Sequence, residues 1–209
     1  MRRATTVLLS TAAVALVATG GTDGGDPTSA TATSETTASQ EPTSDAPATD
    51  APADDPTDGV PPFPENTALQ FAKPSGERGL VFTDVRVAEH EGFDRIVLEF
   101  TGTGIPGWAV NYVDEARREG SGSIVSLGGD AVLSIFASNT TWPAAGYYSG
   151  PQRFEPESGG DIDDVYVGGT WEGATHVLAG IDGAHVPFRV FALTDPSRLV
   201  VDVVDASAD

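Results

Sequence analysis

The sequence predicts an all-β fold, a β-sandwich of two related antiparallel sheets with about nine strands. Two observations support this class. Short runs rich in valine, isoleucine, leucine and aromatic residues recur between residues 79 and 204, and clusters of glycine, proline and aspartate separate them. A pattern typical of a β-hairpin also occurs twice. The one helical candidate, residues 114–119, is too short to be stable by itself.

The repeated pattern is Arg-Val, seven further residues, and a second arginine that opens an apolar run. The first copy begins at Arg86 and the second at Arg189, and each contains a turn signal. We therefore expect equivalent hairpins over residues 85–100 and 188–203, although two ordinary strands can also resemble each other by chance. Because side chains alternate along a strand, one buried face should hold Ile96, Leu98, Phe100, Leu199, Val201 and Val203.

Taken in order, the apolar runs and the turn signals between them predict nine strands. These are residues 79–90, 94–100, 108–113, 123–127, 131–137, 162–167, 170–178, 186–193 and 198–204. Trp108 and Tyr112 share one face of their strand, so we expect both in the core.

Charged residues alternate with the apolar ones on the two closing strands of the repeat. If these strands lie side by side, Arg95 can meet Asp202 and Arg198 can meet Glu99. We expect cross-strand ion pairs, which contribute less than about 1 kcal/mol if they are exposed. A strip that binds glycans or carboxylates is the alternative.

The N-terminal third has a different composition. Arg2 and Arg3 precede a short apolar stretch, and we expect residues 1–20 to be a secretory signal that does not remain as a transmembrane segment. Residues 21–67 are rich in threonine, serine, proline and alanine, are acidic, and contain no lysine or arginine. We expect them to be a disordered linker before a domain at residues 68–209.

Charge and cysteine content exclude several functions. The chain has a formal net charge of −20 at pH 7, which disfavours contact with nucleic acid, since a phosphate-binding surface has the opposite sign. It contains no cysteine, and therefore no disulfide or thiolate metal site. We expect a secreted monomer in the extracytoplasmic cell envelope.

The two hairpins resemble the AMIN domain, and the stronger signal is the second, Phe188 to Val203, with its Asp-Pro-Ser-Arg-Leu-Val-Val-Asp run. More closely, residues 79–206 are similar to the AMIN-like envelope lipoproteins of high-GC Gram-positive bacteria. The resemblance implies a β-sandwich with an envelope role through peptidoglycan contact. Such lipoproteins carry a lipid-modified cysteine after the signal. Here Ala18-Thr19-Gly20-Gly21 stands in that place, so we expect release or trapping in the wall.

We expect no catalytic, cofactor or metal site, and hence a protein that is not an enzyme. No Gly-x-Ser-x-Gly motif is present, which leaves a small hydrolase as the weakest alternative. The three histidines, His90, His176 and His185, lack the spacing of a zinc motif, and we expect them on the surface or in loops. Whether the acidic turn at Asp161, Asp163 and Asp164 binds Ca²⁺ stays open at this point.

The best binding candidate is an aromatic loop, since flat rings stack on sugars and an arginine can hold a carboxylate. Its residues are Trp142, Tyr147, Tyr148, Arg153 and Trp171. The alternative is that two or more of these rings close one end of the sandwich. We therefore expect a domain that binds peptidoglycan or another wall glycan. A protein-interaction module that recognises an envelope protein is the second hypothesis.

Overall fold

The computed structural model describes residues 60–158 and 160–206. The predicted signal, residues 1–20, and the predicted linker as far as residue 59 lie outside the described residues. The part that is described forms ten β-strands and contains no helix. Accordingly, no helix in it has the length and apolar character needed to cross a membrane.

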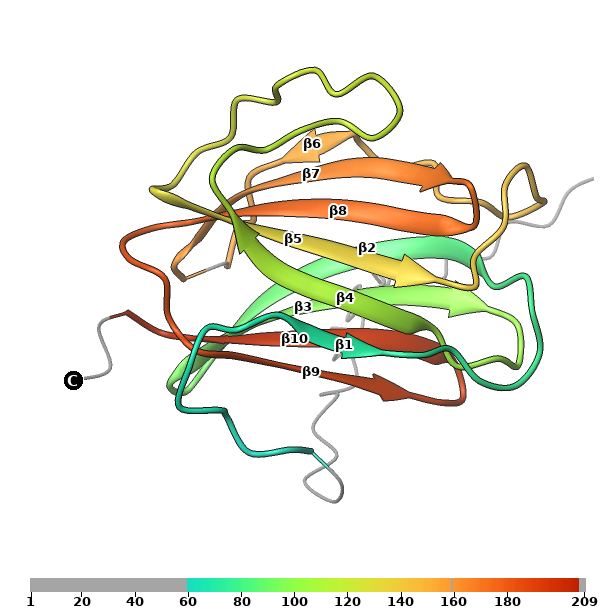
Figure 1. The fold of residues 1–209 in the computed structure, drawn as a ribbon, viewed down its shortest axis with the longest axis horizontal. Helices are drawn as coiled ribbons and strands as arrows, with labels where there is room; N and C mark the ends of the chain where they lie inside the picture. Colours follow the sequence, from blue (N-terminus) through green and yellow to red (C-terminus); the bar gives the residue numbers. More distant parts are fainter. Residues whose placement is uncertain (1–59, 159, 207–209) are drawn as a thin grey trace, which may run out of the picture. The chain divides into compact units, whose positions relative to one another are not determined.

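The ten strands form two antiparallel sheets around a common core, which confirms the predicted sandwich (Figure 1). One sheet has six strands in the order β1 (Gln70–Ala72), β4 (Gly107–Val113), β5 (Ala131–Ser138), β8 (Ala174–Ile181), β7 (Ile162–Trp171) and β6 (Arg153–Phe154). The other has four strands in the order β2 (Val81–His90), β3 (Phe93–Thr101), β10 (Ser197–Val204) and β9 (Phe188–Leu193).

Three details of the strand prediction are wrong. Residues 123–127 form no strand and contribute one isolated bridge, between Arg117 and Ile124. The turn after β7 lies at Glu172-Gly173, so Thr170 belongs to β7 and not to the next strand. Strands β1 and β6, of three and two residues, were not predicted because such short segments show no alternation.

The alternation of the two closing strands is confirmed. All six predicted inward side chains are at most 1% exposed in the core between the sheets: Ile96, Leu98, Phe100, Leu199, Val201 and Val203. Trp108 and Tyr112 are partly buried and pack against the same core, as predicted.

Both copies of the repeat are hairpins, and both lie in the four-stranded sheet. Strands β3 and β10 are its central neighbours, with Arg95 opposite Asp202 and Arg198 opposite Glu99. Val97 pairs with Val200, and these two residues are also equivalent positions of the two copies. The pseudo-two-fold axis that relates the hairpins therefore passes through this valine pair.

The hairpins differ in their turns. In the first, His90 pairs with Phe93 across a two-residue turn whose Gly92 has φ of 85°. In the second, Leu193 pairs with Arg198, so the connection is longer. Arg189 consequently lies directly opposite Asp202, whereas Arg86 lies opposite Val97 and reaches Glu99 diagonally. Each arginine still meets the acidic residue of its own hairpin.

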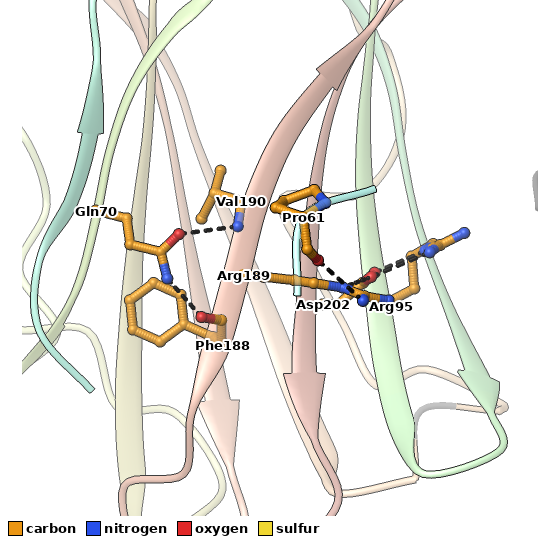
Figure 2. A network of polar contacts seen from close by, with 7 residues as sticks. All are labelled: Pro61, Gln70, Arg95, Phe188, Arg189, Val190 and Asp202. Carbon is orange, nitrogen blue, oxygen red and sulfur yellow. Dashed lines mark hydrogen bonds and ion pairs between the residues drawn. The ribbon is translucent and has the colours of Figure 1, made fainter. Parts of the chain in front are cut away.

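Asp202 is the centre of a buried ion network on the outer face of this sheet (Figure 2). Its side chain is 0% exposed. Arg95 donates through Nε to Oδ1 at 2.6 Å and through Nη2 to Oδ2 at 3.0 Å, and Arg189 donates through Nε to Oδ2 at 2.7 Å. The predicted pairing of Arg95 with Asp202 is confirmed, and because the pair is buried, the small energy expected for an exposed pair does not apply to it.

The burial arises because residues ahead of β1 cover this face. Phe63 packs under the guanidinium of Arg189, which lies 4.1 Å from the ring centroid, and against Phe93 at 5.9 Å. Arg189 also donates a hydrogen bond to the carbonyl oxygen of Pro61. Val60 packs on a small apolar cluster that includes Val97. Within the described residues, contacts with the sandwich thus extend back to Val60, before the expected domain start at residue 68.

Gln70 then joins the edges of the two sheets. From β1 its amide donates to the carbonyl oxygen of Phe188 at 2.5 Å and accepts from the backbone N–H of Val190 at 3.0 Å (Figure 2). These two bonds satisfy one backbone carbonyl and one backbone N–H at the open edge of β9, which would otherwise need partners from another strand.

The outer face of the six-stranded sheet is covered by the connection between β4 and β5. Val125 and Leu127 pack there against Tyr166 and Leu178. The apolar residues that suggested a strand at 123–127 therefore serve as a cover, and Val125 makes its backbone bond to Ala116 within the same connection.

Replacing Leu199 by alanine should lower the free energy of unfolding by about 2–5 kcal/mol, because it leaves a cavity between the sheets. Chemical denaturation of the full chain measures this. Leu69→Ala is the matched control, since Leu69 is 60% exposed and should change stability by less than about 0.5 kcal/mol. Equal effects would contradict the core assignment.

Asp202→Asn should cost about 3–5 kcal/mol, because it removes the buried negative charge that pairs with both Arg95 and Arg189. The pseudo-symmetric change Glu99→Gln is the control. It affects the Arg86 pair, whose side chains are 40% and 31% exposed, and should cost less than about 1 kcal/mol. Denaturation curves at pH 7 compare the two variants, and a cost for Asp202→Asn no greater than for Glu99→Gln would refute the buried network.

Candidate functional site

The predicted aromatic set divides into two exposed indoles and two supporting phenols. Trp142 is 60% exposed and Trp171 is 57% exposed, and both line one groove of about 430 Å³. Tyr147 and Tyr148 are half-buried and pack against the core, where each ring contacts Phe82. The structure therefore brings the two tryptophans together and places Tyr147 behind Trp142.

The groove with the tryptophans, called here the aromatic groove, lies at the end of the sandwich where β7 turns into β8. Residues 140–142 form one wall and residues 170–173 the other. Two residues of the β7–β8 turn have positive φ, Glu172 at 47° and Gly173 at 84°, as a tight hairpin turn requires. The N–H of Thr140 donates to the carbonyl oxygen of Gly173 at 3.1 Å and so joins the two walls.

Tyr147 holds both tryptophan-bearing segments. Its ring contacts Trp142 edge to face, with centroids 6.5 Å apart. Its hydroxyl oxygen accepts a hydrogen bond from the backbone N–H of Thr170, next to Trp171, at 2.9 Å. Because Tyr147 itself rests on Phe82, the indoles stand on a support that is continuous with the core.

A second groove, of about 630 Å³, continues from the first and shares Thr140, Thr141 and Gly173 with it. We call it the polar groove. Arg78 and Asn139 line it, and Arg78 is exposed and forms no ion pair with another described residue. Nδ2 of Asn139 donates to the carbonyl oxygen of Glu77 at 2.7 Å, which fixes this wall. A ligand that stacks on the indoles thus has a cationic group within the adjoining groove.

Arg153, the fifth predicted residue, lines neither groove. It lies on β6 and makes an ion pair with the buried Asp164, with Nε 3.0 Å from Oδ1. The hydrogen bond to Asp164 raises the pKa of Arg153, and the negative charge of Asp164 adds to this effect. Asp164 also accepts from the N–H of Gly128. Tyr148, which likewise lines neither tryptophan groove, donates its hydroxyl to the carbonyl oxygen of Pro151.

The three acidic residues of the turn considered for Ca²⁺ lie in different surroundings. Asp164 is committed to Arg153, and Asp163 is exposed, but Asp161 lies in a cluster with Asp94 and Asp205. Burial raises the pKa of Asp94 to about 6. The hydrogen bond from Asp161 opposes this shift, and the negative charges of Asp205 and Asp161 reinforce it. Sequence spacing gave no indication of this cluster, because its members come from distant parts of the chain.

The histidines are placed differently from one another. His185 is exposed and stacks on Tyr112, and His90 is half-buried and stacks on Phe93. The prediction of a surface position is wrong for His176, which is 3% exposed on β8. Its ring stacks on Phe136 with centroids 4.0 Å apart, and Nε2 lies 3.1 Å from Oγ of Ser134. Burial lowers the pKa of His176 to about 4.

Comparison with protein families gives a match to the AMIN-like domain over residues 80–205, which spans both hairpins and all strands except β1. A comparison with curated proteins gives no match.

His176 should make the domain less stable as the pH falls from about 6.5 to about 4. In this interval the unfolded chain binds a proton on this residue that the folded chain does not, so stability decreases by up to about 3 kcal/mol. Asp94, with its raised pKa, contributes in the opposite direction between about 6 and 3.8. The measurement is therefore the difference in unfolding free energy between the parent and His176→Gln, taken from pH 7 to pH 4. Parallel profiles would contradict the prediction.

Proposed function

Because this chain belongs to the AMIN-like domain family, whose members are non-catalytic, extracytoplasmic domains of the cell envelope, we propose that it binds peptidoglycan or another wall glycan through the aromatic groove. The observation on which the proposal depends is the pair of exposed indoles, Trp142 and Trp171, that line one groove. Exposed tryptophans on a rigid support are otherwise costly in water, and sugar rings offer apolar faces that cover them.

The support behind the indoles favours binding over flexible exposure. Tyr147 contacts Trp142 and hydrogen bonds to Thr170, so the groove keeps its form without a ligand. A preformed groove loses little conformational entropy when a glycan enters, which improves the affinity of a small contact area.

Charge selects among wall polymers. With a net charge of −20, the chain repels anionic polymers such as teichoic acids. Arg78 in the polar groove supplies a local cation, and it takes the place that we expected for Arg153 in holding a peptidoglycan carboxylate. Binding should therefore be weak, selective for peptidoglycan and only modestly dependent on salt.

The double change Trp142→Ala/Trp171→Ala should reduce retention of the full chain on purified sacculi at least tenfold, while leaving the unfolding transition within about 1 kcal/mol of the parent, since both side chains are exposed. Co-sedimentation with sacculi, with and without teichoic acid, measures retention. Tyr147→Phe removes only the hydroxyl that holds Thr170 and should weaken retention less.

Phe71→Ala is the matched control and tests the second hypothesis, a protein partner. Phe71 is 65% exposed on edge strand β1, about 19 Å and four strand spacings from the end of β7. If the indole variant sediments like the parent, the glycan proposal fails. If Phe71→Ala alone loses envelope association, recognition of a protein along β1 becomes the better explanation.

A further inference from the structure

Three carboxylates from separate parts of the chain converge at the opposite end of β7 from the aromatic groove. Asp94 is the second residue of β3, Asp161 directly precedes β7, and Asp205 directly follows β10. One carboxylate oxygen from each lies within 4.8 Å of the others. Asp94 and Asp205 belong to the four-stranded sheet and its continuation, and Asp161 leads into the six-stranded sheet, so the cluster spans both layers of the sandwich.

Asp94 is the buried member of this cluster, and one of its two carboxylate oxygens lacks a hydrogen-bond partner within the described part of the chain. Its side chain is 1% exposed, and Oδ2 accepts from the backbone N–H of Asp161 at 2.7 Å. Oδ1 is buried and has no hydrogen-bond partner among the described residues, and the same holds for Oδ1 of Asp205. A buried carboxylate oxygen without a partner is costly, and two of them in one cluster require an explanation.

The surrounding charges increase this cost. Asp161 and Asp205, with Glu89 nearby, act on Asp94 with the same sign, and Glu89 faces Asp94 across the β2–β3 pair. The hydrogen bonds that the cluster receives come from backbone N–H groups, those of Asp161 and Ala206, so they bring no positive charge. Negative groups therefore meet around the buried carboxylate of Asp94, without a basic side chain to balance them among the residues of the cluster.

We propose that Asp94, Asp161 and Asp205 bind a divalent cation, Ca²⁺, that joins the two sheets at this end of the domain. The donors are carboxylate oxygens only, which favours a hard cation over zinc. Three carboxylates from one chain suit Ca²⁺, which takes six to eight oxygen ligands, better than Mg²⁺, which keeps several waters and is usually bound through one or two carboxylates. Asp161 and Asp205 are half-buried, so a cation reaches the buried oxygen of Asp94 from their side.

The inference is independent of the proposed glycan binding, because the cluster and the aromatic groove share no residue. It also differs from our expectation that the chain has no metal site. Of the three acidic residues considered from the sequence, only Asp161 takes part. The cation would hold the N-terminal end of β3, the start of β7 and the chain after β10 in one place, which stabilises the contact between the sheets.

The test is titration of the EDTA-treated full chain with CaCl₂ by calorimetry, together with denaturation in EDTA and in 10 mM CaCl₂ at equal ionic strength. A dissociation constant of about 10⁻⁴–10⁻³ M, as in other extracellular modules, should lower the unfolding constant about 10- to 100-fold at 10 mM Ca²⁺. MgCl₂ should have a smaller effect. Asp94→Asn and Asp205→Asn should each abolish the calcium effect. Both should fold in EDTA, since each removes one of the repelling charges.

Asp163→Asn is the matched control: it removes an exposed charge two residues from Asp161 and should keep the full response. Absence of a calcium response in the parent overturns the proposal. An equal response in Asp205→Asn also overturns it, because it shows that Ca²⁺ only screens the net charge of −20. Should Asp94→Asn fail to fold, the half-buried Asp205 variant decides alone. An equal response to Mg²⁺ overturns the assignment to Ca²⁺.

Discussion

The buried carboxylate of Asp202 needs positively charged partners, and the arrangement of the four-stranded sheet depends on supplying them. Its carboxylate is sealed from water, and a buried charge is tolerated only where opposite charges and hydrogen bonds replace the lost hydration. Arg189 comes from its own hairpin and Arg95 from the other one, so the requirement is met only when β3 and β10 pair in the observed register. A slip by one residue would place Arg95 on the opposite face, among the core side chains. The network therefore selects the register at the centre of the sheet.

The same network depends on a cover that comes from outside the sheet. Phe63 and Phe93 pack around the guanidinium of Arg189, and Arg95 lies over Phe93 and Phe191. These rings exclude water and also interact favourably with the cations. The sequence predicted the pairing of Arg95 with Asp202 from the repeat, but not its burial. Alternation describes a strand and its faces, whereas the residues that cover the face lie in a proline-rich segment without a period.

The candidate site, too, could be predicted from the sequence only in part. Composition indicated an aromatic loop as the candidate, but it could not separate the exposed Trp142 from the supporting Tyr147, because both occur in one Gly/Pro-rich segment. Arg78 was missed since it lies far from Trp142 and Trp171 in the sequence. The Asp94 cluster was missed for a different reason: its members become neighbours only when β3, β7 and β10 are in place. His176 was misplaced because a lone histidine in a strand gives no signal of its burial.

The distance in sequence between the two hairpins has a consequence for the order of folding. Arg189 and Asp202 are 13 residues apart, so their hairpin can form early and locally with the carboxylate still hydrated. Arg95 and Asp202 are 107 residues apart, and the six-stranded sheet is largely built from the chain between them. Closing so long a loop costs entropy before any contact compensates for it. Desolvation of Asp202 is thus tied to the least local strand pairing among the described strands, and a chain that stops folding before that step keeps its central carboxylate in water.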